Sequence, residues 1–366
     1  MSHIHGGDIE EAKKKYNIKG DMIIDFSVNI NFIGPPPDLY NNIVKNITDI
    51  ERYPEPNSRK LKIKLSEHHG INLENIVLAN GAVEIIYQLL DIIKAKNVLI
   101  MEPAFSEYEM AVLKSGGSVE LLLLKEKNNF KADVDEIIEM MSGVDLIFIC
   151  NPHNPSGHLL LRPEIEKILK SAESQGVFMV LDEAFIDFVD NLEGTTLINS
   201  VDKYKNLFII RSMTKFYAIP GLRLGYGVGA KELISNIEQG RDPWNVNILA
   251  QRAGLEALSS NKYINLSRRK NREERLFLFN ELKKITGIIP FKPAANFIFL
   301  KISKDDMDVD VLSAKLAEKG ILIRDCSSYQ GLDKNYFRLA VKSRKENIFL
   351  LQNLKNILNT YSYGGN

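Results

Sequence analysis

A buried apolar segment and a polar loop follow one another in residues 208–226, which read Phe208-Ile209-Ile210-Arg211-Ser212-Met213-Thr214-Lys215-Phe216-Tyr217-Ala218-Ile219-Pro220-Gly221-Leu222-Arg223-Leu224-Gly225-Tyr226. The apolar start predicts a buried strand, and the polar residues after it predict a loop. The loop carries Lys215, with the hydroxyls of Ser212 and Thr214 just before it. Arg223 follows eight residues after the lysine.

The side chains of this loop suit a phosphorylated aldehyde. A lysine amine forms a Schiff base with an aldehyde, while hydroxyls and a guanidinium hydrogen-bond phosphate oxygens. The pattern therefore indicates pyridoxal phosphate as a cofactor. The alternative is that Lys215 is a solvated surface lysine, and the loop alone does not separate the two interpretations.

Length and composition exclude several classes of protein. With 366 residues and 45% hydrophobic composition, the chain is long enough for one large and one smaller domain. Lysine plus arginine and aspartate plus glutamate each number 47, so no net charge favours a nucleic-acid partner. Cys150 and Cys326 lie in apolar or strand-like contexts, which fits a reducing compartment. No apolar stretch suits a membrane span or a signal core, so we expect a cytoplasmic protein without a membrane partner.

Strand-like and helical segments alternate through the middle of the chain. Helices are expected at 82–93 and 106–115, and apolar strands at 76–79, 98–101, 119–124, 146–150, 177–181, 207–210 and 226–228. This pattern predicts an α/β fold, with a mostly parallel sheet covered by helices on both faces. A charged helical region at 261–284 and the pattern after it predict a smaller α+β domain.

We therefore expect three parts. Residues 1–40 form an N-terminal arm that joins the small domain, because the prolines at 35–37 keep its end extended. Residues 41–259 form the large cofactor-binding domain, and residues 260–366 form the small C-terminal domain.

Three more strand ends carry suggestive residues, and such ends gather at one edge of a parallel sheet. Gly81 opens a helix, and its amide with those of Ala82 and Val83 suits a phosphate. Asn154 lies in a turn between two prolines. Asp182 ends a buried apolar strand, where a carboxylate needs a partner such as a protonated pyridine nitrogen. Each motif alone also fits an ordinary turn.

Together, the motifs resemble fold-type-I pyridoxal-phosphate enzymes of the histidinol-phosphate aminotransferase group. They are Asn151-Pro152-His153-Asn154-Pro155-Ser156-Gly157, Asp182-Glu183-Ala184-Phe185, Ser212-Met213-Thr214-Lys215 and Gly221-Leu222-Arg223-Leu224-Gly225. The resemblance covers nearly the whole chain in order and spacing. It implies the fold-type-I transferase architecture and a homodimer with shared active sites.

The resemblance also implies cofactor contacts for single residues. Lys215 would carry the cofactor and move protons, and Asp182 would pair with the pyridine nitrogen. Asn154 would contact the ring hydroxyl, and Phe105 would stack on the ring. The phosphate would be bound by Tyr53 of the neighbouring subunit, by Ser212, Thr214 and Arg223, and by the amides of Gly81, Ala82 and Val83.

Substrate contacts follow from the same resemblance. Arg338 would clamp the α-carboxylate with two hydrogen bonds, with Asn31 nearby. Arg324 is assigned to a substrate phosphate, and its alternative is an exposed strand-end arginine paired with an acidic neighbour. His5 and Gly6 belong to an opening motif that the resemblance places near the substrate. No metal is expected.

Other segments are similar to the threonine-phosphate decarboxylases of cobalamin biosynthesis. They are His5-Gly6-Gly7, Asp25-Phe26-Ser27-Val28-Asn29-Ile30-Asn31, Asp182 to Phe188, Lys215 to Gly221, and Pro243-Trp244-Asn245-Val246-Asn247. We expect decarboxylation of L-threonine O-3-phosphate to (R)-1-amino-2-propanol O-2-phosphate. One alternative is a histidinol-phosphate aminotransferase or a related class I/II aminotransferase. A second is a catalytically idle protein that uses the fold for binding or regulation.

Overall fold

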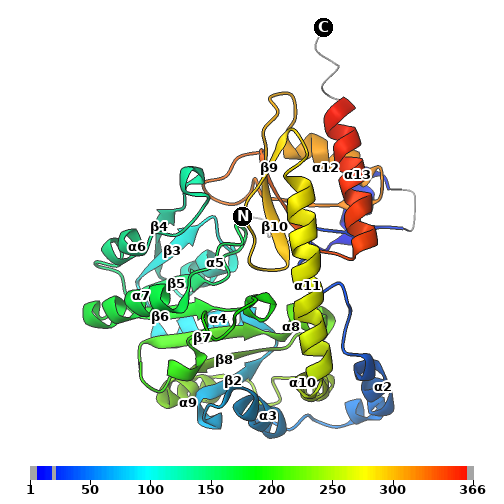
Figure 1. The fold of residues 1–366 in the computed structure, drawn as a ribbon. Helices are drawn as coiled ribbons and strands as arrows, with labels where there is room; N and C mark the ends of the chain where they lie inside the picture. The colour runs from blue at the N-terminus through cyan, green and yellow to red at the C-terminus, as the bar shows by residue number, and fades with distance from the viewer. Residues whose placement is uncertain (1–5, 19–21, 361–366) are drawn as a thin grey trace.

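A seven-stranded sheet forms the centre of the larger part of the molecule (Figure 1). The structure is a computed structural model, and it describes residues 6–18 and 22–360. The strands of this sheet are β2 (Ile76–Ala79), β3 (Asn97–Glu102), β4 (Ser118–Leu123), β5 (Leu146–Cys150), β6 (Phe178–Asp182), β7 (Leu207–Ser212) and β8 (Gly225–Gly229). Their order is β2-β8-β7-β6-β5-β3-β4, and only β8 runs antiparallel to its neighbours. The predicted mostly parallel sheet is confirmed.

Both faces of this sheet are buried under helices. Successive strand residues point to opposite faces, and Val180 and Leu181 accordingly belong to two different apolar clusters. One cluster includes side chains of α3 (Arg59–His69), α6 (Val134–Met140), α7 (Arg162–Gln175) and α10 (Ile248–Ser259). The other includes side chains of α4 (Ala82–Ile93), α5 (Glu107–Lys114) and α9 (Lys231–Gly240). Burial on both faces explains why the strands are apolar throughout.

A smaller antiparallel sheet lies beside the large one. Its order is β12 (Arg324–Asp325), β13 (Tyr336–Ala340), β10 (Phe297–Ile302) and β9 (Ile288–Pro290). The helices of this part are α11 (Asn261–Leu282), α12 (Val309–Ala317) and α13 (Arg344–Thr360). Figure 1 shows α11 running from this sheet down to α10. Among residues 6–18 and 22–360, no helix combines the length and apolar character needed to cross a membrane.

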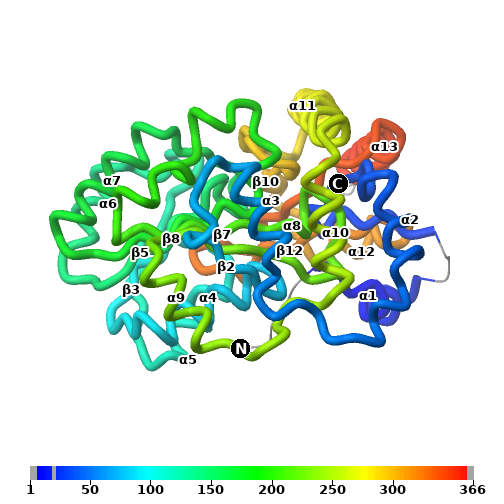
Figure 2. The backbone as a smooth tube through the Cα atoms, turned by 90° about the horizontal axis from the view of Figure 1, so that it is seen from below, coloured from blue at the N-terminus to red at the C-terminus, as the bar shows by residue number. Residues whose placement is uncertain are grey.

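The N-terminal segment packs on the C-terminal third of the chain. It contains α1 (Ile9–Tyr16), β1 (Ile24–Asp25) and α2 (Pro37–Lys45), and β1 pairs in parallel with β11 (Ile321–Leu322). Phe26 is fully buried in the apolar cluster formed by α11, α12 and α13, and its carbonyl accepts a hydrogen bond from the Ala340 amide. Figure 2 shows this blue segment alongside the orange and red elements.

The Lys215 segment is helical instead of the predicted loop. Residues Met213–Phe216 form the single turn of α8. Ser212 caps this turn, because its hydroxyl accepts a hydrogen bond from the Thr214 amide. The turn fixes the direction in which the lysine leaves the end of β7.

Candidate active site

The ends of β6 and β7 bring a carboxylate and a lysine into one buried site. Asp182 is the last residue of β6, and Lys215 follows β7, its direct neighbour in the sheet. Burial, and after it the positive charges of Arg223 and Arg338, lower the pKa of Lys215 to about 8. The negative charge of the Asp182 carboxylate opposes this change by raising the pKa of Lys215. The site therefore holds a lysine that loses its proton at a lower pH than a solvated lysine does.

Two hydrogen bonds fix the Asp182 carboxylate. The Tyr108 hydroxyl donates to Oδ2 at 2.5 Å, and the Ala184 amide donates to Oδ1 at 2.8 Å. Burial raises the pKa of Asp182, while these two donors and the charge of Lys215 oppose that rise. The orientation of the buried carboxylate is thus fixed by one donor on each of its oxygens.

A basic and amide-rich surface lies at the start of α4. Gly81 precedes this helix with a φ of +87°, and a Cβ there would lie 2.6 Å from the Arg223 guanidinium. Glycine suits this position because of its positive φ, and the Arg223 guanidinium lies against its Cα at the start of α4. Free amides at a helix N-terminus and a guanidinium both favour an anion.

Two hydroxyls lie next to the lysine turn. Ser212 Oγ and Thr214 Oγ1 are 2.7 Å apart and buried. The Met213 amide donates to the Leu224 carbonyl at 3.1 Å, which holds the turn against the segment that carries Arg223. The predicted phosphate donors on these two segments are therefore tied to one another.

Arg338 on β13 reaches across to the turn at the end of β5. Its Nη1 donates to Asn154 Oδ1, and its Nη2 donates to the Ser27 carbonyl at 3.1 Å. Gly6 packs on the same arm residue, since a Cβ at Gly6 would lie 2.7 Å from Ser27 Oγ. The structure thus brings together Asn154, Arg338 and Gly6, three of the predicted site residues.

Arg324 and Arg338 are buried side by side. They are paired residues on the antiparallel strands β12 and β13, and each is less than a tenth exposed. Both guanidinium groups contact neutral partners, and that of Arg324 lies 5.5 Å from the centre of the Tyr329 ring. Burial lowers the pKa of Arg338, and the charge of Arg324 acts in the same direction. Two buried cations with neutral partners form a strong anion site.

Asn31 does not extend its side chain toward the Lys215 amine. Its Nδ2 donates to the carbonyl of Phe216 at 2.8 Å, and its Oδ1 accepts from Asn271 at 2.9 Å. Its backbone amide donates to the Lys215 carbonyl at 3.0 Å. These bonds hold the arm against α8 and α11, and a substrate contact of Asn31 stays a prediction.

The predicted cofactor contacts Phe105 and Tyr53 and the predicted substrate contact His5 differ in where they lie. Phe105 is partly buried and meets Tyr108 edge to face, with ring centres 5.8 Å apart. Tyr53 is 76% exposed and stacks on Trp244. His5 lies outside the described residues.

Sequence reasoning missed Tyr108 and Tyr329. Tyr108 follows Phe105 by three residues, next to the start of α5, and the two rings are in contact. That spacing was the available signal for Tyr108. Tyr329 follows the β12 strand in an irregular segment, and no local pattern marks it.

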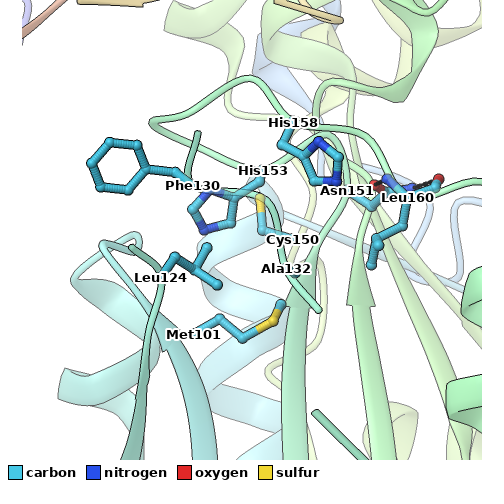
Figure 3. Close-up of a pocket in the computed structure, with 9 residues that line it drawn as sticks. All are labelled: Met101, Leu124, Phe130, Ala132, Cys150, Asn151, His153, His158 and Leu160. Carbon is cyan, nitrogen blue, oxygen red and sulfur yellow. Dashed lines mark hydrogen bonds between the residues drawn. The ribbon is translucent and has the colours of Figure 1, made fainter. Parts of the chain in front are cut away.

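A separate small pocket lies beside the turn that carries Asn154 (Figure 3). It is lined by Met101, Leu124, Phe130, Ala132, Cys150, Asn151, His153, His158 and Leu160. Burial lowers the pKa of His153 and of His158 to about 4, so both rings are neutral at pH 7. The His153 Nδ1 hydrogen-bonds Ser156 Oγ at 2.8 Å within the turn. Lys215 does not line this pocket, so the pocket is separate from the candidate active site.

Comparisons with known proteins agree with this geometry. The profile of the family "Aminotransferase class I and II" matches residues 21–353. The chain is 37% identical over 329 residues to a putative threonine-phosphate decarboxylase of Caldanaerobacter subterraneus, covering 90% of this chain and 89% of that one. It is 35% identical to the threonine-phosphate decarboxylase of Salmonella typhimurium, covering 97% and 96%. The crystal structure of the histidinol-phosphate aminotransferase from Clostridium acetobutylicum superposes with a TM-score of 0.86 and 35% identity, covering 92% and 100%. The chain belongs to the aminotransferase class I and II family.

Proposed function

We propose that the chain is a pyridoxal-phosphate-dependent lyase that decarboxylates L-threonine O-3-phosphate to (R)-1-amino-2-propanol O-2-phosphate in cobalamin biosynthesis. The observation that carries the substrate class is the buried pair Arg324 and Arg338. Two adjacent guanidinium groups suit a substrate with two anionic ends, a carboxylate and a phosphate. The reaction type rests on similarity to the Salmonella decarboxylase over 97% of this chain.

The residues around Lys215 fit pyridoxal phosphate. The Arg223 guanidinium lies where a Cβ of Gly81 would be, at the N-terminus of α4. A guanidinium and helix N-terminal amides are both groups that bind phosphate. The buried Asp182 carboxylate has Lys215 as its charged neighbour and suits a protonated pyridine nitrogen. Lys215 would carry the cofactor, and the other contacts are Asn154, Phe105, Ser212, Thr214, Arg223, Tyr53 and the amides of Gly81, Ala82 and Val83. When bound, the cofactor supplies an electron sink for negative charge at the substrate Cα.

The chain's own residues would direct the reaction. Arg338 holds the α-carboxylate, and Arg324 holds the phosphate at the other end of the substrate. These two contacts fix the direction of the bond between Cα and the carboxylate carbon, which breaks as carbon dioxide leaves. Lys215 in its protonated, ammonium form would then deliver a proton to Cα in place of the carbon dioxide, and a pKa of about 8 lets this group both give and regain a proton.

We also propose a homodimer with shared active sites in the cytoplasm. Large apolar side chains are exposed on α2 and on the segment after it, namely Tyr40, Val44, Ile50 and Tyr53. An exposed apolar surface of this kind marks a protein interface. The strand pairing of β1 with β11 supports an arm over residues 1–40 that joins a small domain at 260–366, with the large domain at 41–259.

Transamination of histidinol phosphate is the second candidate, because the Clostridium acetobutylicum structure is equally similar in sequence. The test offers the purified enzyme either L-threonine O-3-phosphate alone or histidinol phosphate with 2-oxoglutarate. Carbon dioxide from the first substrate supports the decarboxylase. Glutamate formed only from the second mixture supports the aminotransferase, and no product from either supports a catalytically idle protein.

A further inference from the structure

The only tryptophan of the chain packs on Tyr53, the residue proposed to reach the cofactor phosphate. The rings of Trp244 and Tyr53 are stacked, with centres 4.3 Å apart and planes 25° from parallel. Both rings are exposed, Trp244 to 42% and Tyr53 to 76%. Stacking against a fixed ring restricts the rotamers of an otherwise solvated tyrosine.

A glutamine on α10 ties together the two segments that carry these rings. Gln251 Nε2 donates to the Glu55 carbonyl at 3.1 Å, two residues after Tyr53. The same atom donates to the Val246 carbonyl at 2.9 Å, two residues after Trp244. The stack is therefore supported by hydrogen bonds on both of its chain segments.

The tryptophan segment is also fastened to the start of α4. Asn245 Nδ2 donates to Glu84 Oε1 at 2.5 Å, and Asn80 Nδ2 donates to the Asn245 carbonyl at 2.6 Å. The second oxygen of Glu84 accepts a hydrogen bond from the Asn80 amide at 2.5 Å. The segment that carries Trp244 is thus fastened to the start of α4 in its own chain.

We propose that Trp244 is a positioning residue that holds the Tyr53 ring in the orientation from which its hydroxyl reaches the phosphate of the pyridoxal phosphate bound in the neighbouring subunit. This role rests on the proposed function. Without the indole, the exposed Tyr53 side chain samples several rotamers, and binding the phosphate must then fix it. Trp244 therefore strengthens cofactor binding through Tyr53 and without touching the cofactor.

The test measures the Kd of the apoenzyme for pyridoxal phosphate by absorbance titration. Trp244→Ala should raise the Kd about 2- to 10-fold, the range expected for loss of an aromatic pair. Trp244→Phe should restore most of the affinity, because a benzene ring stacks as well. Phe349→Ala is the control, since Phe349 is 39% exposed on α13, and it should leave the Kd unchanged.

A double-mutant cycle separates positioning from a direct contact. If Trp244 acts through Tyr53, the double variant Trp244→Ala/Tyr53→Ala binds the cofactor no more weakly than Tyr53→Ala alone. Additive losses, or no loss in Trp244→Ala, overturn the positioning role and leave the proposed function intact. A parent apoenzyme that binds no pyridoxal phosphate overturns both.

Fluorescence gives a readout that is independent of the cofactor. Because Trp244 is the only tryptophan, the emission of the apoenzyme reports on it alone. Tyr53→Ala should uncover one indole face and increase quenching by acrylamide, while Phe349→Ala should not. Equal quenching in the parent and in Tyr53→Ala contradicts the stack.

Discussion

At the residue scale, the chemistry depends on how burial and charge adjust single groups. The Lys215 amine is surrounded by low-dielectric protein and by two guanidinium groups, so the pKa of Lys215 falls to about 8. At pH 7 about a tenth of the Lys215 side chains are then neutral, whereas an ordinary solvated lysine, with a pKa of about 10.4, is neutral in fewer than about one molecule in a thousand. Lys215 is therefore suited both to attack an aldehyde and to move a proton.

Replacing Lys215 should remove both roles. In Lys215→Ala, we expect no visible absorbance band that borohydride fixes to the protein, and loss of turnover by at least about 10³-fold. The control is Lys231→Ala, which removes an exposed lysine that pairs with Glu74. Borohydride-fixed cofactor in the Lys215 variant would show that another lysine carries it.

Replacing Arg324 should weaken recognition of the substrate phosphate. A hydrogen-bonded charge pair contributes about 1.5–3 kcal/mol, so Arg324→Gln should raise KM for L-threonine O-3-phosphate by about 10- to 100-fold. Arg269→Gln is the control, because the Arg269 side chain is 66% exposed on α11 and its partner Glu273 is also exposed. An unchanged KM in Arg324→Gln would exclude a contact between Arg324 and the substrate phosphate and would indicate a structural role.

At the element scale, the sequence predicts the helices and strands that have a regular pattern of apolar residues. The strands of the large sheet are buried on both faces, so their apolar runs are continuous and easy to recognise. The helix around Lys215 is a single turn set by the Ser212 cap, and its short length leaves no periodic pattern. The Tyr108 contact joins residues 74 positions apart, so no local signal reveals its partner, Asp182.

The turn that carries Asn154 should make the apoenzyme sensitive to acid. Burial holds the pKa of His153 at about 4, below its ordinary value of 6.5. Between these values the unfolded chain binds more protons, so stability is full above pH 6.5 and falls as the pH drops toward 4. A shift of this size corresponds to about 3 kcal/mol.

Denaturant unfolding of the apoenzyme at pH 7.5, 6 and 5 checks this dependence. We expect the free energy of unfolding to fall more steeply with acid in the parent than in His153→Gln, which cannot titrate. Parallel pH curves for the two proteins would exclude His153 as a source of acid sensitivity.

At the scale of the whole molecule, the proposed function involves a second subunit. Tyr53 lies in a turn remote in sequence from Lys215 and is mostly exposed in the single chain. Exposed apolar residues on α2 extend the same surface. A second subunit would cover this surface and receive the tyrosine.

Mixed subunits test this sharing. Tyr53→Ala and Lys215→Ala homodimers should each have low activity, and a hybrid of the two should recover up to about half of the parent activity per site, because one of its sites has both residues. Differently tagged subunits allow the hybrid to be isolated. A purified hybrid without recovered activity would place Tyr53 and Lys215 of one site in the same chain.

The proposed decarboxylation needs no second substrate. A transaminase must regenerate its amino-group carrier with a 2-oxo acid, whereas a decarboxylase turns over with one substrate. The decisive measurement is the carbon dioxide released per active site from L-threonine O-3-phosphate when no 2-oxo acid is present. We predict many equivalents of carbon dioxide and an equal amount of aminopropanol phosphate. No release, together with 2-oxoglutarate-dependent consumption of histidinol phosphate, would contradict the account and identify an aminotransferase.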